Sequence, residues 1–78
     1  MSRVLLLGPA REAAGVGEDH LEGDTVEEVL RVAVERYGSA FAEVLAVSRV
    51  WVNGEAASLD QSVGPHDEVA VLPPVSGG

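Results

Sequence analysis

The sequence predicts an α+β domain in which one amphipathic helix packs across a small mixed sheet. Three observations lead to this prediction. Apolar runs lie near the two ends of the chain, at residues 3–7 and 69–72. Between them, apolar residues recur at helical spacing over residues 26–37. The pair Asn53-Gly54, a strong hairpin signal, then follows a β-rich segment.

The chain has 78 residues, enough for one small domain and too few for a deep catalytic cleft. This size favours a non-catalytic subunit over a complete enzyme. We expect residues 1–72 to form the domain and residues 73–78 a flexible tail, because Pro73 and Pro74 favour an extended course. The sequence contains neither a membrane-spanning apolar run nor a signal-peptide pattern, so we expect a cytoplasmic protein.

The formal net charge of −8 argues against nucleic acid and anionic membrane as partners, because both attract Lys and Arg. It favours a basic protein partner. Cysteine is absent, which excludes disulfides, thiolate metal sites and cysteine-borne sulfur within this chain. Lysine is absent as well, so no side chain can receive an isopeptide bond. The chain can act as a donor in such a reaction but cannot form a polymer.

The first expected element is a strand over residues 3–7, whose nearly continuous apolar run is typical of strands buried on both faces. Gly8 and Pro9 are expected to end it and to begin a loop. Residues 11–15 have helical propensity over one turn, and a short edge strand is expected at residues 20–22.

The expected main helix begins after Thr25, which forms a capping box with Glu28, and stops at Gly38. Its apolar stripe consists of Val26, Val29, Leu30, Ala33, Val34 and Tyr37. The same spacing continues over residues 41–45, where we expect a short second helix that covers the core.

A β-rich strand is expected over residues 47–52, followed by the hairpin turn and a weak arm over residues 55–58. Residues 59–67 have the composition of a loop, and residues 69–72 form another buried strand that Pro73 ends.

The first and last strands are the most apolar, so we expect them to pair at the centre of the sheet. If they pair in parallel, the tail leaves from the edge of the sheet opposite to Met1. This order of elements is that of the β-grasp, or ubiquitin-like, fold.

No group of residues inside the domain predicts catalysis or metal binding. His20 and His66 stand apart in the sequence and are interpreted as solvated loop residues. Trp51 is interpreted as a core or half-buried anchor of the sheet, with a position facing a partner as the alternative. Four acidic residues are assigned to helix surface or to contacts with a basic groove of a partner: Glu27, Glu28, Glu35 and Glu43.

By elimination, the one reactive group is the carboxylate of Gly78. Gly77 and Gly78 have no β-carbon, so this end is slim enough to enter a narrow channel. A carboxylate must be activated before it is attacked, and ATP can do this by forming an acyl-adenylate on another enzyme. Attack by a sulfide equivalent would then give a thiocarboxylate, and attack by a lysine an isopeptide bond. The residues alone do not decide between these two products. They also allow a third possibility, a binding module whose C-terminal carboxylate does not react.

Three segments resemble the small subunits of molybdopterin synthase, which are ubiquitin-like sulfur carriers. They are Arg11-Glu12-Ala13-Ala14-Gly15, Val52-Asn53-Gly54-Glu55 and the stretch from Asp67 to Gly78. The last segment is highly specific, because related carriers for thiamine or tRNA thiolation share Gly-Gly but usually lack the Pro-Pro-Val-Ser lead-in. The resemblance implies that an activating enzyme adenylates Gly78 and that a sulfur donor converts it into a thiocarboxylate.

The resemblance also implies that the tail inserts into the large subunit of the synthase, which holds the catalytic lysine. The inserted residues would be Pro73, Pro74, Val75, Ser76 and Gly77, ahead of Gly78. Two carriers in turn would deliver the dithiolene sulfurs to cyclic pyranopterin monophosphate, within a heterotetramer. The carrier would bind no cofactor directly, and the activating enzyme would use the ATP. The alternatives are a carrier for thiamine, cysteine or tRNA thiolation, or a ubiquitin-like protein modifier.

The sequence departs from the family pattern at two places. Residues 8–10, Gly-Pro-Ala, replace a commoner run that contains an aromatic residue, and residues 64–66, Gly-Pro-His, replace the usual Asp-Gly turn. We expect both departures to change the shape of loops without touching the tail.

Overall fold

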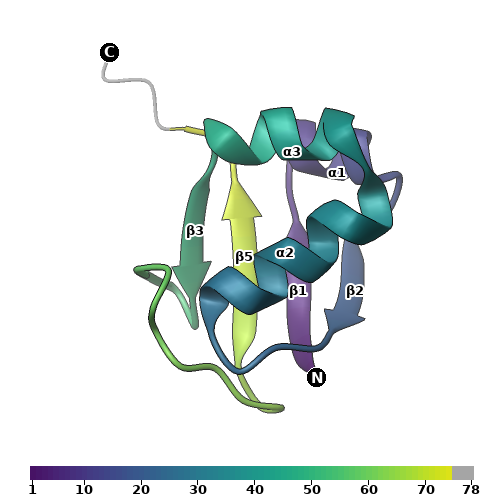
Figure 1. Cartoon of the computed structure of the whole chain (residues 1–78). Coiled ribbons are helices and arrows are strands. Elements are labelled where there is room, and N and C mark those ends of the chain that lie inside the picture. The colour runs from purple at the N-terminus through teal and green to yellow at the C-terminus, as the bar shows by residue number, and fades with distance from the viewer. Residues whose placement is uncertain (75–78) are drawn as a thin grey trace.

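The computed structural model describes residues 1–74, which form a five-stranded sheet and three helices (Figure 1). Helices α2 and α3 cover one face of the sheet, and α1 lies beside α3 near the end of β1. The elements in chain order are β1 Ser2–Leu6, α1 Pro9–Ala14, β2 Glu18–Leu21, α2 Val26–Tyr37, α3 Ser39–Ala46, β3 Arg49–Val52, β4 Glu55–Ala56 and β5 Glu68–Leu72.

The strand order is β2-β1-β5-β3-β4. The central strands β1 and β5 are parallel, with Leu6 beside Val71, and the other neighbouring pairs are antiparallel. Because β1 and β5 run in the same direction, the C-terminal end of β5 lies at the opposite end of the strands from Met1 (Figure 1). The central parallel pair and the single long helix across the sheet confirm the predicted β-grasp fold.

The core lies between the sheet and the two helices that cover it. Alternate residues of each strand point toward the helices, as the two-residue period of a strand requires. The fully buried large side chains are Val4, Leu6, Leu21, Val26, Val29, Phe41, Val69 and Val71. The predicted helical stripe therefore supplies the helix side of the core. Phe41 of α3 adds to it and contacts the ring of Tyr37 at a centroid distance of 5.2 Å.

Helix α2 is held at both of its ends. Thr25 accepts a hydrogen bond from the Glu28 amide at 3.2 Å, which confirms the predicted cap, while the Glu28 carboxylate accepts from the Asp24 amide. In the last turn, the Tyr37 hydroxyl donates to Asp19 of β2. This hydrogen bond is the main reason why the pKa of Asp19 lies below its ordinary value. Burial, followed by the same hydrogen bond, raises the pKa of Tyr37.

Two local predictions are wrong. Pro9 does not begin a loop but is the first residue of α1, where its fixed φ suits the helix and its missing N–H is not needed. His20 is an exposed residue of the edge strand β2, so its interpretation as a loop residue is wrong, while the edge strand expected near residues 20–22 is present at residues 18–21. The hairpin prediction is confirmed, since Asn53 and Gly54 both have positive φ, at 52° and 85°.

Candidate functional site

The candidate site begins where the sheet ends. β5 stops at Leu72, and the next two residues, Pro73 and Pro74, are exposed and outside regular secondary structure. We call these two prolines the tail root. The remaining predicted site residues, Val75, Ser76, Gly77 and Gly78, lie outside the described residues. The division into a domain over residues 1–72 and a tail over residues 73–78 therefore stays a prediction.

The tail root lies against the turn that joins β1 to α1. The Leu7 amide donates to the Val71 carbonyl at 3.1 Å, one residue before the turn. A β-carbon built on Gly8 would lie 3.5 Å from Cγ of Pro73. The expectation that the departure at residues 8–10 does not touch the tail is therefore wrong, because parallel pairing brings Gly8 beside Pro73. The departure at residues 64–66 has no such contact: a β-carbon built on Gly64 would meet only Asp67.

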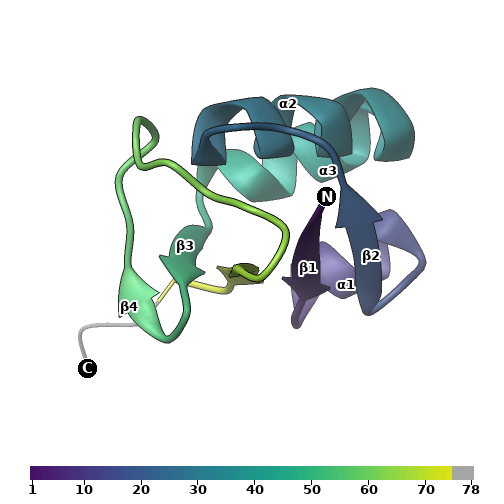
Figure 2. The same cartoon turned by 90° about the horizontal axis from the view of Figure 1, so that it is seen from below.

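The face of the sheet that carries no helix is partly apolar, and we call it the open face (Figure 2). Its apolar residues follow from the strand registers and are Leu5, Trp51, Ala56, Ala70 and Leu72. Trp51 pairs with Ala70 on one side and Ala56 on the other, and it is 36% exposed.

Trp51 is thus not a core residue but a partly buried residue of the sheet, the second of the two forms in which the prediction was made. In β3, the valines at 50 and 52 point toward the helices, so the residue between them must point away. The prediction that the first and last strands are buried on both faces is wrong for the same reason. Their residues on the open face, Leu5, Ala70 and Leu72, are only half-buried because helices cover only the other face.

Charged residues border these apolar residues. Arg3 of β1 forms ion pairs with Glu18 at 3.0 Å and with Glu68 at 3.3 Å. Arg49 pairs with Leu72 in the sheet, near the tail root, and forms no ion pair with another of residues 1–74. An apolar centre with a charged border is the usual anatomy of a protein–protein interface. The open face therefore has the character of a docking surface that is continuous with the tail root.

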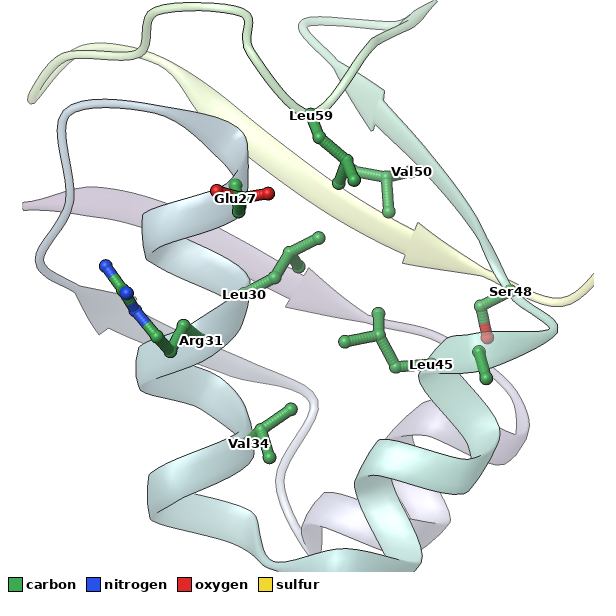
Figure 3. A pocket seen from close by; sticks show the side chains of 9 residues that line it. Glu27, Leu30, Arg31, Val34, Leu45, Ser48, Val50 and Leu59 are labelled. Atoms are coloured by element: carbon green, nitrogen blue, oxygen red, sulfur yellow. The ribbon is translucent and has the colours of Figure 1, made fainter.

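A second surface feature lies on the helix side of the sheet. It is an apolar groove of about 450 Å³ between α2, the end of α3 and β3. Figure 3 shows the side chains that line it, among them Leu30, Val34, Leu45, Val50 and Leu59. Glu27 and Arg31 are the charged residues that line it. The groove can accept an apolar side chain, but the residues that line it do not form a catalytic site.

Within residues 1–74, no group of three or more His, Cys, Asp or Glu residues could hold a metal ion. In the same part of the chain, no helix is long and apolar enough to cross a membrane. Of the acidic helix residues, Glu27, Glu35 and Glu43 are exposed, and Glu28 is half-buried in its capping role. The part of the site that the sequence did not predict consists of the open face and Gly8. Two-residue alternation would have revealed the open face, but the continuous apolar runs of β1 and β5 hide it.

The sequence profile of the ThiS family matches residues 4–78. No curated protein sequence is significantly similar to that of the chain. Among solved structures, SAMP1 from Haloferax volcanii is 31% identical, with a TM-score of 0.79 over 99% of this chain and 98% of that one. The small archaeal modifier protein 1 (SAMP1) from Methanosarcina acetivorans is 29% identical, with a TM-score of 0.87 over 99% and 95%. A putative molybdopterin converting factor subunit 1 from Pyrococcus furiosus is 28% identical, with a TM-score of 0.84 over 95% and 97%.

Proposed function

The chain belongs to the ThiS family of ubiquitin-like sulfur carriers, and on this premise we propose that it carries sulfur, as a thiocarboxylate on Gly78, to the synthesis of molybdopterin. The observation that carries this proposal is the tail root. Pro73 and Pro74 are exposed at one end of the β-grasp sheet and lead into Val-Ser-Gly-Gly. The 28% identity to a putative molybdopterin converting factor subunit supports it.

The first step of the proposed cycle is activation. The Gly78 carboxylate attacks the α-phosphate of ATP on a separate activating enzyme, which releases pyrophosphate and leaves an acyl-adenylate. A sulfur donor at the oxidation level of sulfide then attacks the acyl carbon. The bond to AMP breaks, a carbon–sulfur bond forms, and the product is a thiocarboxylate. The chain itself has no cysteine or lysine, so the adenylation and the transfer of sulfur both need groups from partner proteins.

The second step is delivery. The tail enters the large subunit of molybdopterin synthase, and its sulfur attacks a carbon of the pyranopterin precursor, cyclic pyranopterin monophosphate. A carbon–sulfur bond forms as a carbon–oxygen bond of the precursor breaks, and the oxygen leaves as water or with the phosphate. Hydrolysis of the acyl–sulfur bond leaves the sulfur on the precursor and returns the Gly78 carboxylate for another cycle. Two carriers act in turn to supply the two dithiolene sulfurs, which fits a heterotetramer with two small and two large subunits. The partner's channel positions the reacting atom, and the catalytic lysine that the resemblance implies belongs to the large subunit.

We assign docking to the open face. Leu5, Trp51 and Leu72 offer a half-exposed apolar surface next to the tail root. A partner that covers this surface receives the tail at the same time. Arg49 provides a positive charge at this end of the face, while the chain as a whole has a net charge of −8. Complementary charges on the partner would steer the association and make its rate depend on salt.

A second candidate function is protein modification. It is favoured by the identities of 31% and 29% to two proteins that are named small archaeal modifiers or SAMP1. The activation step would be the same, but the amine of a lysine on another protein would attack the acyl carbon in place of sulfide. Lysine-linked conjugates in a lysate of the native cells would support this function, and their absence would argue against it.

The test is the mass of the C-terminal peptide from protein isolated from its own cells. Replacement of one Gly78 oxygen by sulfur is the expected result. A plain carboxylate, even after incubation with ATP, the activating enzyme and a sulfur donor, would contradict the proposal.

A chain without Gly78 serves as the control. It should fold and dock but fail to support molybdopterin formation. If a thiamine, cysteine or tRNA precursor consumes the sulfur and none is transferred to the pyranopterin, the chain serves a different sulfur pathway.

A further inference from the structure

We propose that Arg49 determines which surface can cover the open face: its guanidinium pairs with a carboxylate on the docking surface of the activating enzyme. This inference rests on the proposed function, because it names the chemistry of the partner that covers the open face. It concerns docking alone and assigns no part in the reaction at Gly78 to Arg49.

Arg49 is the first residue of β3 and lies at the end of the open face where the tail root leaves. Figure 1 shows the start of β3 beside the end of β5, and in the sheet Arg49 pairs with Leu72, the last residue of β5. Val50 and Val52 point toward the helices, so Arg49 points to the same face as Trp51. It is exposed, and it borders the apolar centre of the open face.

The charges at the other end of the open face already compensate one another. Arg3 lies between two carboxylates, with Glu18 at 3.0 Å and Glu68 at 3.3 Å. Its Nε also donates a hydrogen bond to Glu18. Arg49 forms neither an ion pair nor a side-chain hydrogen bond with another of residues 1–74. Among the charged side chains that the strand registers place on this face, only Arg49 therefore lacks an opposite charge within residues 1–74.

A partner that covers the open face takes water away from Arg49. A guanidinium remains charged in proteins, and its burial without an opposite charge is strongly unfavourable. A carboxylate beside it offsets this cost, and the two carboxylate oxygens match the planar fork of the guanidinium. The fitting partner is therefore a protein with an apolar docking surface and an Asp or Glu at the end that meets the tail root. A surface with Lys or Arg at that position is rejected.

Arg31 provides a control with the same change of charge. It is an exposed residue of α2, on the helix side of the sheet. Like Arg49, it forms no ion pair and no side-chain hydrogen bond with another of residues 1–74. Arg49→Met and Arg31→Met each remove one positive charge and keep an unbranched apolar stem, so they change the net charge of the chain equally. Only Arg49→Met removes a charge from the open face.

The experiment measures Kd for the activating enzyme by isothermal titration calorimetry without ATP, at low and at high salt. Arg49→Met should raise Kd at least about 10-fold, because it leaves the carboxylate of the enzyme unpaired. Arg49→Glu should raise Kd further, since two carboxylates then meet. Arg49→Lys, which keeps the charge but loses the fork, should lie between the wild type and Arg49→Met. Arg31→Met should bind like the wild type.

Salt separates a pair inside the interface from attraction at a distance. Salt screens a buried pair much less than exposed charges, so the ratio of Kd between Arg49→Met and the wild type should persist at high salt. Equal changes for Arg49→Met and Arg31→Met would overturn the proposal, as would tighter binding by Arg49→Met. Loss of the ratio at high salt would also overturn it, because Arg49 would then act by steering alone. Urea unfolding of each free variant checks that it is folded during the titration.

The mass of the C-terminal peptide separates this inference from the proposed function. If the variants bind alike while Gly78 of the wild type still acquires sulfur, the inference fails and the proposed function stands. If Arg49→Met binds weakly as expected but no sulfur reaches Gly78 of the wild type, the proposed function fails and the role of Arg49 in docking stands. If the wild type does not bind the activating enzyme, both fail.

Discussion

Trp51→Ala is expected to weaken binding of the chain to its activating enzyme by about 40-fold. Trp51 is 36% exposed, and its exposed part lies on the open face. A free Trp side chain presents roughly 250 Å² of surface, so docking would bury about 90 Å² of it. At about 25 cal/mol per Å², this area contributes about 2.2 kcal/mol, which corresponds to about 40-fold in Kd.

Isothermal titration calorimetry at fixed salt measures this change directly. Leu59→Ala is the control, because Leu59 is 54% exposed but lines the apolar groove on the helix side. It should leave Kd unchanged. Urea unfolding of both free variants checks that they are folded at the temperature of the titration. If Leu59→Ala weakens binding and Trp51→Ala does not, the partner docks at the groove, and the assignment of the open face is refuted.

The remaining predictions concern stability. The pKa of Asp19 is lowered in the folded state, mainly by the hydrogen bond from Tyr37. The stability that this carboxylate contributes is complete above its unfolded pKa of about 3.9 and is lost as the pH falls through the lower folded value. Urea unfolding at pH 7 and pH 3 should show this loss, and Tyr37→Phe should reduce it; an unchanged pH dependence in that variant would contradict the assignment. Because the pKa of Tyr37 is raised, stability should also fall as the pH rises above about 10. Gly23→Ala should cost at least about 2 kcal/mol, because its β-carbon would lie 2.7 Å from the Val29 amide nitrogen at a φ of 150°. Gly54→Ala, with positive φ and free space, should cost about 1 kcal/mol, and equal losses for the two glycines would refute the steric argument.

The sequence predicted the elements whose signals are local. The helix over residues 26–37 follows from its apolar stripe and its cap, and the hairpin follows from Asn53-Gly54. The central pairing of β1 and β5 follows from their apolar composition. The open face could not be predicted in the same way. Leu5 and Leu72 are apolar on the uncovered side of the sheet, so these strands have the composition of strands buried on both faces.

The proximity of Gly8 and Pro73 could not be predicted for a different reason. These residues are far apart in the sequence, and only the parallel register that places Leu6 beside Val71 brings them together. Pro9 was interpreted as the start of a loop because Gly-Pro commonly ends an element. Proline is equally suited to the first position of a helix, and only the tertiary structure distinguishes the two.

A chain without lysine or cysteine offers no side-chain amine or thiol to an activated carboxyl, so the acceptor, whether sulfur or amine, must come from a partner. The carrier itself then acts on the reaction through docking. If docking on the open face contributes equally to the ground state and the transition state, its loss raises KM and leaves kcat unchanged. Trp51→Ala should therefore raise KM for adenylation without changing kcat, and a fall in kcat in this variant would contradict a role in docking alone.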